Sequence, residues 1–405
     1  MGVPKESAEG ELRVALIPGS VASLKDREIE VVVEPGAGEA AGHPDSEYEE
    51  AGATLDGAGA WGADVVVKVA PPNPDEIDEL REGQILIGFL NPLVAGESNK
   101  ALADAGVTSF AMEAIPRITR AQSMDALSSQ ANVAGYAATL LAAREAGRFF
   151  PMMTTAAGTV APAKVLVLGA GVAGLQAIAT AKRLGAVVTG FDIRRAAWEQ
   201  IASLGGRPLE LDFIPDAEDE GGYARPLTDE ENEKVREALA ENATRQDVII
   251  TTAQIPGRPA PILITEQGIA NMSPGSVIID LAGESGGNTE KTEAGQTVDV
   301  DGVKIIAPRN LPSDMAAHAS QLYAKNVENL VDLLVDEEGN LSVDFGDEVI
   351  AGACITHEKG VLNERAAKAA GVEPSQAPAA QPPSGGTEAE AAEGKTEEQT
   401  EEKAG

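Results

Sequence analysis

Three glycines, Gly169, Gly171 and Gly174, have the clearest chemical potential, because they form the pattern Gly-x-Gly-x-x-Gly. In a strand–turn–helix context the first glycine permits a tight turn, the second lets backbone amides approach a pyrophosphate, and the third lets helix and strand pack closely. The apolar residues 164–168 predict the strand, and residues 175–184 predict the helix whose positive end would hold the pyrophosphate. The motif therefore predicts a dinucleotide site; a glycine-rich turn that only packs tightly is the alternative.

An acidic residue after the next apolar run indicates which dinucleotide is bound. Asp192 follows Gly174 by 18 residues. A carboxylate at this place accepts hydrogen bonds from the adenosine ribose hydroxyls and repels a 2′-phosphate, which favours NAD(H) over NADP(H). Arg194 and Arg195 come directly afterwards, and a nearby arginine can accommodate such a phosphate. Because the carboxylate takes the ribose position, we predict NAD(H) as the cofactor.

Strands separated by helices are indicated along both halves of the chain. β-rich runs alternate with polar, helix-compatible segments in the first half, and strands of a buried type recur in the second. The first set is residues 14–17, 31–33, 65–69, 85–90 and 108–111, and the second is residues 164–168, 187–192, 247–252, 276–281 and 303–307. This alternation predicts an α/β fold with two Rossmann-like domains and mostly parallel sheets.

Two long helices should connect the domains. Apolar residues recur at helical spacing in residues 129–148 and again in residues 320–335. After the second helix, residues 341–345 and 349–355 are predicted as strands that return to the first domain.

The predicted domain limits follow from these elements. The first Rossmann-like domain is discontinuous, with residues 1–128 plus 325–372, and residues 129–324 form the NAD(H)-binding domain. Residues 373–405 hold no large apolar side chain, so we expect a disordered acidic tail.

The charge of the chain excludes one class of partner. The formal net charge of the 405 residues is −34; the tail, with eight Glu and two Lys, accounts for −6, so −28 lies on residues 1–372. Nucleic acid is a poor partner, because binding phosphates requires clustered Lys and Arg. An acidic surface suits high salt, which screens its self-repulsion, so we predict a halophilic source. An ordinary acidic enzyme is the alternative.

The compartment is indicated by what the sequence lacks. The polar start, residues 1–13, does not resemble a signal peptide, and the most apolar window, residues 165–181, is interrupted by glycines. Cys354 is the single cysteine, so no internal disulfide can form. We expect a soluble cytoplasmic protein.

A longer string is more specific than the glycine pattern. Residues 116–129 are Pro-Arg-Ile-Thr-Arg-Ala-Gln-Ser-Met-Asp-Ala-Leu-Ser-Ser. This string resembles the loop by which NAD(P) transhydrogenases recognise the nicotinamide end of NADH. The similarity extends over roughly residues 1–360, to the NAD(H)-binding part of the alpha subunit, whose fold is shared with alanine dehydrogenases. It is carried further by residues 131–136, 169–175, 191–194, 222–224, 251–261, 280–288 and 320–323.

The resemblance implies roles for individual residues in and beyond that string. The residues that would hold the nicotinamide, its ribose and the pyrophosphate, and so serve catalysis, are Arg117, Gln122, Asp125 and Ser128, with Ile118 and Thr119 in the same loop. The adenosine side would be contacted by Val172, Asp192, Ile193 and Arg194. Gly222 and Tyr223 lie in what resembles a mobile loop that closes over the nucleotide. Gln254 stands where the family usually has an apolar residue, which puts its side-chain role in doubt. A polar surface loop with ordinary helix capping is the alternative for residues 116–129.

Alanine dehydrogenase is the rival function within this family. Arg13 and Lys68 match positions where those enzymes hold a substrate carboxylate, but their histidine lies near Asn91, and the three histidines here are elsewhere. Interconverting a carbonyl and an amine requires a general acid/base, whereas hydride transfer between two nicotinamides requires proximity, alignment and exclusion of water. The chemistry therefore favours transhydrogenase. Asp280 and Glu284 are expected to shape the pocket rather than to catalyse.

The resemblance also implies partners. A transhydrogenase of this kind would pass hydride from NADH to NADP(H) bound on a partner subunit, coupled to proton movement through membrane-spanning subunits. We expect the chain to associate peripherally with the cytoplasmic face of the membrane through those subunits, and to form a homodimer. A non-catalytic NAD(H) sensor is the alternative from another class, although a sensor would not need a nicotinamide loop.

Overall fold

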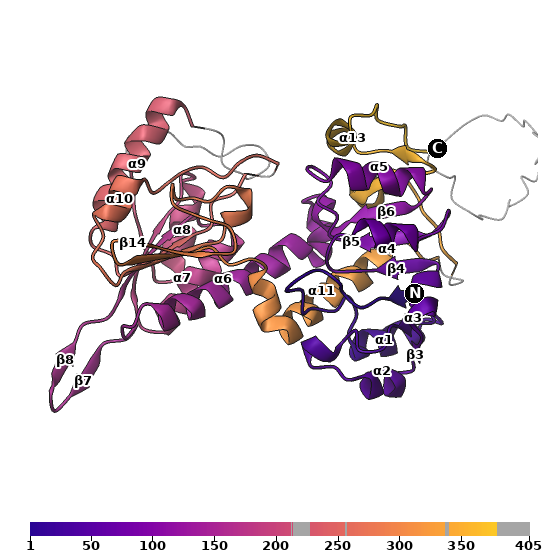
Figure 1. The fold of residues 1–405 in the computed structure, drawn as a ribbon, viewed down its shortest axis with the longest axis horizontal. Helices are drawn as coiled ribbons and strands as arrows, with labels where there is room; N and C mark the ends of the chain where they lie inside the picture. Colours follow the sequence, from indigo (N-terminus) through magenta and orange to yellow (C-terminus); the bar gives the residue numbers. More distant parts are fainter. Residues whose placement is uncertain (212, 214–226, 256, 337–339, 379–405) are drawn as a thin grey trace, which may run out of the picture.

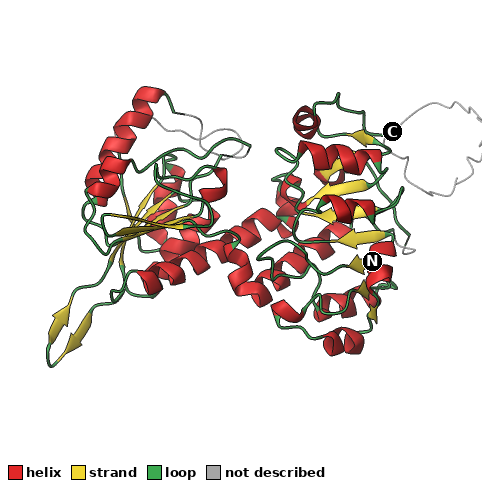
Figure 2. Ribbon diagram, viewed as in Figure 1, coloured by secondary structure: helices red, strands yellow, loops and turns green. Residues whose placement is uncertain are grey.

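Two lobes joined by a pair of helices make up the described part of the chain (Figure 1). The structure, a computed structural model, describes residues 1–211, 213, 227–255, 257–336 and 340–378. Each lobe is a layered domain with helices packed on a central sheet (Figure 2). The predicted tail, residues 379–405 in particular, and the predicted closing loop with Gly222 and Tyr223 lie outside these residues.

The first domain contains an eight-stranded sheet in the described residues. Its order is β17-β16-β6-β5-β4-β1-β2-β3. The strands are β1 (Gly2–Val3), β2 (Val32–Val33), β3 (Thr54–Leu55), β4 (Val65–Val67), β5 (Ile85–Gly88), β6 (Thr108–Ala111), β16 (Cys354–His357) and β17 (Gly360–Val361). Strands β1 to β6 are parallel, and the last two add antiparallel edges. The order of the parallel strands, 3-2-1-4-5-6, is that of a Rossmann fold.

The second domain repeats the same plan within its described residues. Its seven-stranded sheet has the order β11-β10-β9-β12-β13-β15-β14, and only β14 is antiparallel to its neighbour. The strands are β9 (Lys164–Leu168), β10 (Val187–Phe191), β11 (Arg207–Pro208), β12 (Val248–Thr251), β13 (Val277–Asp280), β14 (Thr297–Val300) and β15 (Val303–Ile306). The prediction of an α/β fold with two Rossmann-like domains and mostly parallel sheets is confirmed, whereas the residue limits of the domains stay a prediction.

Helices cover the faces of both sheets. The first domain contributes α1 (Pro18–Lys25), α2 (Asp45–Ala51), α3 (Gly57–Gly62), α4 (Pro74–Asp78), α5 (Gly96–Asp104), α12 (Glu348–Ala353) and α13 (Glu364–Ala370). The second contributes α7 (Val172–Arg183), α8 (Ala196–Ser203), α9 (Asp229–Ala243) and α10 (Glu266–Ala270). Short 3₁₀ turns are η1 (Glu39–Ala41), η2 (Met112–Ala114), η3 (Thr119–Met124), η4 (Gly283–Ser285) and η5 (Leu311–Met315).

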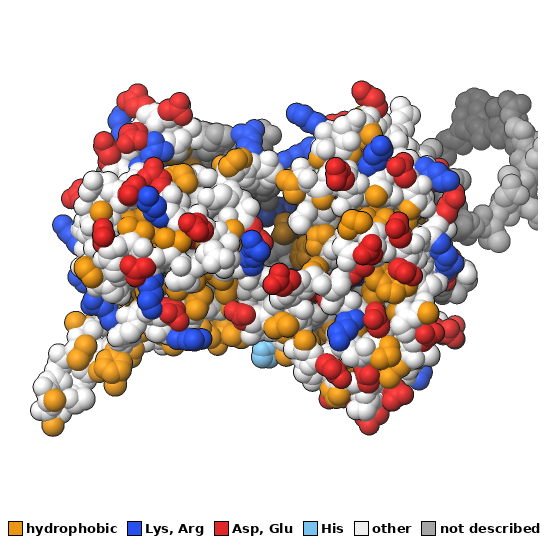
Figure 3. All heavy atoms as spheres, viewed as in Figure 1, with side chains coloured by type: hydrophobic (Ala, Val, Ile, Leu, Met, Phe, Trp, Pro, Cys, Tyr) orange, Lys and Arg blue, Asp and Glu red, His pale blue; other side chains and the backbone are white. Residues whose placement is uncertain are grey.

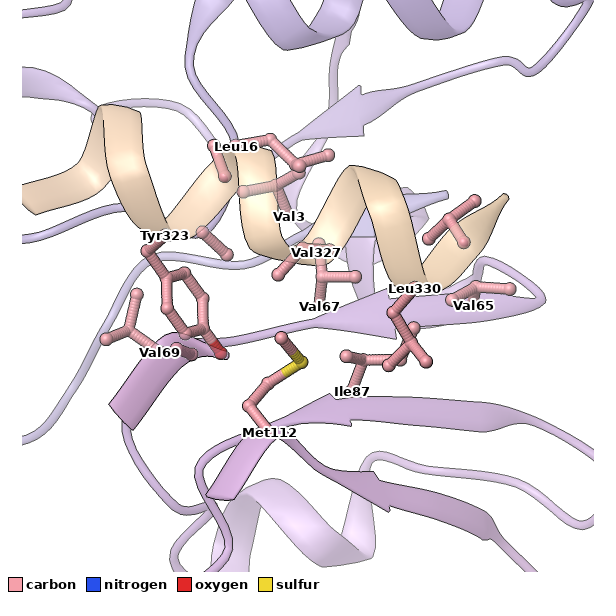
Figure 4. Close-up of a cluster of buried hydrophobic side chains, with 14 of the residues drawn as sticks. Val3, Leu16, Val65, Val67, Val69, Ile87, Met112, Tyr323, Val327 and Leu330 are labelled. Atoms are coloured by element: carbon pink, nitrogen blue, oxygen red, sulfur yellow. The ribbon is translucent and has the colours of Figure 1, made fainter. Parts of the chain in front are cut away.

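The two connecting helices, α6 (Ala126–Glu145) and α11 (Ala316–Val331), begin three to four residues before the predicted positions. Helix α11 lies across the sheet of the first domain, where Tyr323, Val327 and Leu330 point toward the strands (Figure 4). All three side chains are fully buried. The apolar stripe that predicted this helix is therefore the stripe that buries it in the core.

Three predicted strands of the first domain are wrong. Residues 14–17 lie in the segment before α1, where the Val14 amide donates to Ser320 Oγ at 3.0 Å instead of to a strand. Most of residues 349–355 form α12, because the Asp347 carboxylate caps the amides of residues 349 and 350 and starts a helix. Residues 341–345 contribute one isolated bridge, from Leu341 to Val335.

A hairpin of the second domain was not predicted. Strands β7 (Met153–Thr155) and β8 (Gly158–Val160) form this hairpin, which projects away from the lobe (Figure 1). Its residues are exposed, so it adds nothing to the core. Among the described helices, none is long and apolar enough to cross a membrane.

Candidate nucleotide-binding site

The glycine pattern lies at the carboxyl end of β9, where it turns into α7. Gly169 has φ +93°, and a Cβ there would lie 2.6 Å from Thr252 Oγ1. A Cβ on Gly174 would collide with the carbonyl group of Gly169, so the third glycine allows close packing of helix and strand. A Cβ on Gly171 would meet nothing within 4 Å. The backbone before the 12-residue helix α7 thus faces open space, which fits a pyrophosphate at the helix N-terminus.

Asp192 follows β10 and lies next to this turn. Its Oδ2 accepts the Ala170 amide at 2.8 Å, and its Oδ1 accepts the Arg194 amide at 2.9 Å. The Arg194 guanidinium binds both carboxylate oxygens, at 3.0 Å through Nε and 2.9 Å through an NH₂ group. Four N–H groups of the described residues therefore donate to one carboxylate, which has about four lone-pair positions. Arg194 lies where it would have to yield if ribose hydroxyls were to bind.

The string predicted to hold the nicotinamide belongs to the other domain. It follows β6 and η2, forms η3, and ends at Asp125, the N-cap of α6. Asp125 accepts the Ser128 amide at 2.9 Å and the Ser128 hydroxyl at 2.6 Å, so two of the predicted residues are bound to each other. Arg117 and Gln122 are exposed on the same loop.

The loop is anchored from outside by side chains that the sequence did not single out. Asn326 and Asn329 of α11 both donate to the Ser123 carbonyl oxygen, at 2.7 and 3.0 Å. On the other side, Arg120 makes two hydrogen bonds to Asp347, at 2.9 and 2.8 Å. These contacts hold η3 against α11 and α12, so Gln122 lies on a fixed turn.

The carboxyl edges of the two sheets face each other. A Cβ built on Gly257, in the segment after β12, would lie 3.3 Å from a methyl of Leu93, in the segment after β5. On the connecting side, a Cβ on Gly135 of α6 would collide with the Ala173 carbonyl of α7. The space-filling view shows the molecule hollowed between the lobes (Figure 3). The glycine turn and the nicotinamide loop both follow strands at these edges, as ligand sites of open α/β sheets do.

Gln254 and Asp280 complete the second domain's edge. Gln254 donates to the Leu281 carbonyl oxygen at 2.8 Å, a bond that an apolar residue could not make. Asp280 is fully buried and accepts from the Thr251 and Thr292 hydroxyls and from two backbone amides. A carboxylate bound in this way is a structural brace, which is the role the sequence favoured.

The corresponding crevice of the first domain, between β1 and β4, is filled by charged side chains of the chain itself. Lys68 Nζ donates to Glu6 Oε2 and to Glu76 Oε1, each at 3.0 Å, and Lys68 is 1% exposed. Burial lowers the pKa of Lys68, but the two glutamates raise it above its usual value, so the ammonium stays charged. Arg13 binds both oxygens of Glu11, at 2.7 and 2.6 Å. Both cations are thus already paired with carboxylates.

Asn91 lies beside this crevice with φ +50°. Its amide and that of Leu90 donate to Glu113 Oε1, at 2.6 and 2.9 Å. Burial raises the pKa of Glu113, whose Oε2 has no hydrogen-bond partner among the described residues. No sequence pattern pointed to Glu113, which holds the turn where an alanine dehydrogenase would carry its histidine.

The structure brings the adenosine-side residues Val172, Asp192, Ile193 and Arg194 to one edge of the second domain, close to the glycine turn. Residues 117–128 form a second group, on the first domain. The partners of Arg13 and Lys68 were missed, because nothing in the sequence links residues so far apart along the chain.

Comparison with known proteins agrees with this architecture. The family described as "Alanine dehydrogenase/PNT, N-terminal domain" matches residues 2–134, and "Alanine dehydrogenase/PNT, C-terminal domain" matches residues 138–364. The chain is 47% identical over 374 residues to the first of the polypeptides that make up the NAD(P) transhydrogenase alpha subunit of Rhodospirillum rubrum, covering 90% of this chain and 97% of that protein.

Two further relatives bracket the family. The crystal structure of a transhydrogenase from Sinorhizobium meliloti matches with a TM-score of 0.78 and 46% identity, covering 89% of this chain and 98% of that chain. The alanine dehydrogenase of Bacillus subtilis is 32% identical over 324 residues, which cover 77% of this chain and 79% of that protein. The chain belongs to the alanine dehydrogenase/transhydrogenase family, and its identity to the transhydrogenase alpha subunits is the higher of the two.

Proposed function

We propose that the chain is the NAD(H)-binding component of a proton-translocating NAD(P) transhydrogenase. It transfers hydride between NADH and NADP⁺ bound on a partner subunit, and the reaction is coupled to proton movement across the membrane. The observation that carries this proposal is the pairing of a dinucleotide turn beside Asp192 with a separately anchored loop at residues 117–128, on the facing edge of the other domain. Bound NADH would supply the hydride, and the chain would supply alignment.

The alternative function, alanine dehydrogenase, is disfavoured by the crevice of the first domain. A pyruvate or alanine carboxylate would need Arg13 or Lys68, and both are held by glutamates of the chain. A proton donor or acceptor is needed as well, and Asn91 cannot titrate. The other alternative, an NAD(H) sensor, gives no reason to anchor the nicotinamide loop on both sides.

The proposed roles of individual residues follow the same division. Gly169, Gly171 and Gly174, with Val172, would take the pyrophosphate, while Asp192, Ile193 and Arg194 would contact the adenosine. Gln122 and Arg117, with Ile118, Thr119, Asp125 and Ser128, would hold the nicotinamide end. The Gln254 side chain would support the wall of the pocket through its bond to Leu281. Gly222 and Tyr223 would close over the nucleotide.

The partners would be the NADP(H)-binding and membrane-spanning subunits of the same enzyme, which would hold this chain peripherally at the cytoplasmic face of the membrane. A second copy of the chain is a further proposed partner. An isolated two-stranded hairpin is marginally stable, and the β7–β8 hairpin exposes Met152, Met153 and Val160 by 63%, 38% and 50%. Replacing residues 152–160 by a short Gly-Ser link should convert a dimer to a monomer in light scattering; a parent that is already monomeric would refute the homodimer.

The acidic composition supports a halophilic source. With a net charge of −34, the chain repels itself at low ionic strength, and the screening length falls from about 8 Å at 0.15 M to about 3 Å at 1 M salt. Its melting temperature should therefore rise when KCl is raised from 0.15 to about 1 M. A melting temperature that is flat or falls over that range would favour an ordinary acidic enzyme.

The principal test is equilibrium binding of NADH and NADPH to the purified chain, followed by rapid mixing with the NADP-loaded partner component. We expect tight NADH binding, weak NADPH binding and hydride transfer without any added keto acid. Absence of transfer in the presence of the partner, together with intact NADH binding, would favour the sensor. Turnover of pyruvate and ammonium by the chain alone would favour the dehydrogenase.

A further inference from the structure

A buried polar cluster lies where the chain crosses between its domains. The chain leaves the first domain along α6 and returns through η5 into α11, and the N-terminal segment lies against both crossings. Arg13 donates through NH1 to Gln130 Oε1 of α6 at 2.9 Å, and through NH2 to Asn310 Oδ1 at 3.0 Å. The Leu12 amide donates to Ser313 Oγ of η5 at 3.1 Å. One short segment of the first domain is thus bound to both connections.

Glu11 completes this cluster. Besides binding Arg13, its carboxylate accepts the Ser313 hydroxyl at 2.7 Å and the Asn310 amide at 2.9 Å. Glu11 is 9% and Arg13 7% exposed. A buried ion pair contributes little net stability, because desolvation offsets the attraction, but its hydrogen bonds hold a single geometry. The cluster therefore fixes the angle between the domains more than it stabilises the fold.

The cluster extends into the nicotinamide loop through a chain of hydrogen bonds. Gln130 Nε2 donates to Ser129 Oγ at 3.2 Å, and Ser129 Oγ donates to Asn326 Oδ1 at 2.7 Å. Asn326 Nδ2 donates in turn to the Ser123 carbonyl oxygen at 2.7 Å. Ser123 is the neighbour of Gln122. The path from Arg13 to this loop, which we call the junction relay, is therefore made of direct contacts.

We propose that Arg13 and Gln130 are positioning residues for hydride transfer, which act on the nicotinamide loop through the junction relay. The inference rests on the proposed function. The adenosine half of NADH would bind the second domain and the nicotinamide half the first, so the interdomain angle and the pose of the loop set the position of the ring. A displacement of about 1 Å can cost on the order of a hundredfold in rate when the reaction depends on alignment.

The test compares Gln130→Met with Gln84→Met, a matched control. Gln84 is as buried as Gln130, at 2% against 5% exposed. It also makes three hydrogen bonds, to Trp61, Ala63 and Arg81, in the first domain and outside the relay. Both variants lose buried hydrogen bonds and should lose similar thermal stability. Only Gln130→Met separates Arg13 from the nicotinamide loop.

Two readouts distinguish positioning from general damage. The first is equilibrium binding of NADH and of ADP-ribose, which lacks the nicotinamide, to the full chain. We expect ADP-ribose affinity to stay within about twofold in Gln130→Met, while the advantage of NADH over ADP-ribose falls about fivefold, as for one hydrogen bond lost. The second is single-turnover hydride transfer to the NADP-loaded partner, which should fall by about 10- to 100-fold. Gln84→Met should match the parent in both readouts.

Ser129→Ala provides a second variant if Gln130→Met does not fold. It cuts the relay in the middle, at a half-buried hydroxyl, and should reduce transfer in the same direction by a smaller factor. The inference is overturned if Gln130→Met and Gln84→Met lower transfer equally, or if NADH and ADP-ribose affinities fall together. A parent chain that transfers no hydride would refute the proposed function; the binding comparison on the isolated chain would still decide whether the relay orients the nicotinamide.

Discussion

Replacing Asp192 by Asn should weaken the preference for NADH over NADPH. The substitution keeps the size of the side chain and removes its charge, at a position that is 7% exposed. It also places an amide N–H₂ group beside the Arg194 guanidinium, which now binds both carboxylate oxygens. Arg194 would then turn more readily toward a 2′-phosphate, so the variant changes the affinity for both nucleotides.

The size of the change can be worked from these contacts. A hydrogen bond to a charged acceptor contributes about 1.5–3 kcal/mol, so loss of the charge should weaken NADH binding by roughly 10- to 150-fold. Two like charges about 4 Å apart repel by about 1 kcal/mol in water and about 4 kcal/mol at an effective dielectric constant of 20. Relief of that repulsion strengthens NADPH binding. Together the two changes should reduce the selectivity at least about fiftyfold.

The assay is titration of the parent and variant chains with NADH and NADPH, followed by the fluorescence of the reduced nicotinamide. Asp247→Asn is the matched control. Asp247 also binds a backbone amide, that of Lys164 at 2.9 Å, and an arginine, Arg148 at 3.0 Å, but it precedes β12 at the opposite edge of the sheet. The control should keep the parent's selectivity. An Asp192→Asn chain that is folded and equally selective would refute the role of Asp192.

Three further predictions address the other half of the site and the crevice of the first domain. Gln122→Asn shortens the side chain by one methylene, so it should bind NADH within a few-fold of the parent but transfer hydride about a hundredfold more slowly; a parallel fall of rate and affinity would make Gln122 a plain binding residue. Asn91→His should not create alanine dehydrogenase activity, measured as NADH oxidation with pyruvate and ammonium, because Arg13 and Lys68 stay paired; robust turnover would contradict this. Burial raises the pKa of Glu11, but Arg13 outweighs it and holds that pKa below its usual 4.5. The resulting stability is present above pH 4.5 and lost as the pH falls through the lower folded value, so Glu11→Gln should be less stable than the parent at pH 7 by about 3–5 kcal/mol, with the gap closing below pH 4.5. Denaturant unfolding at several pH values measures this gap, and a gap independent of pH would be inconsistent with it.

The second domain was predictable because its signals are local. The strand over residues 164–168 has the limits that the sequence predicted, and the glycine turn and Asp192 follow from short-range chemistry. Apolar runs buried on both faces, such as β12 and β13, leave little ambiguity. The exposed hairpin β7–β8 escaped notice, because neither strand has a buried face and so neither alternates.

The first domain was harder because tertiary contacts override its local pattern. Residues 14–17 are apolar and buried like a strand, yet the amide of Val14 binds a side chain of α11, some 300 residues away. Residues 349–355 are equally apolar, but one capping carboxylate, that of Asp347, starts a helix there. The same holds for the site: Arg13 and Lys68 were visible in the sequence, whereas the partners that decide their role were not.

Those partners explain how one fold can lose a substrate while keeping its cofactor. A free keto acid that competes for Arg13 must displace Glu11, which is two residues away on the same rigid segment and accepts hydrogen bonds from Asn310 and Ser313 as well. A tethered group acts at an effective concentration of millimolar even on a flexible linker, and far more on a rigid one. A small carboxylate at millimolar levels therefore cannot displace it, whether or not a histidine replaces Asn91. Restoring a dehydrogenase would require removal of the glutamates before addition of the acid/base, because a proton donor has no use until the substrate has a cation to bind.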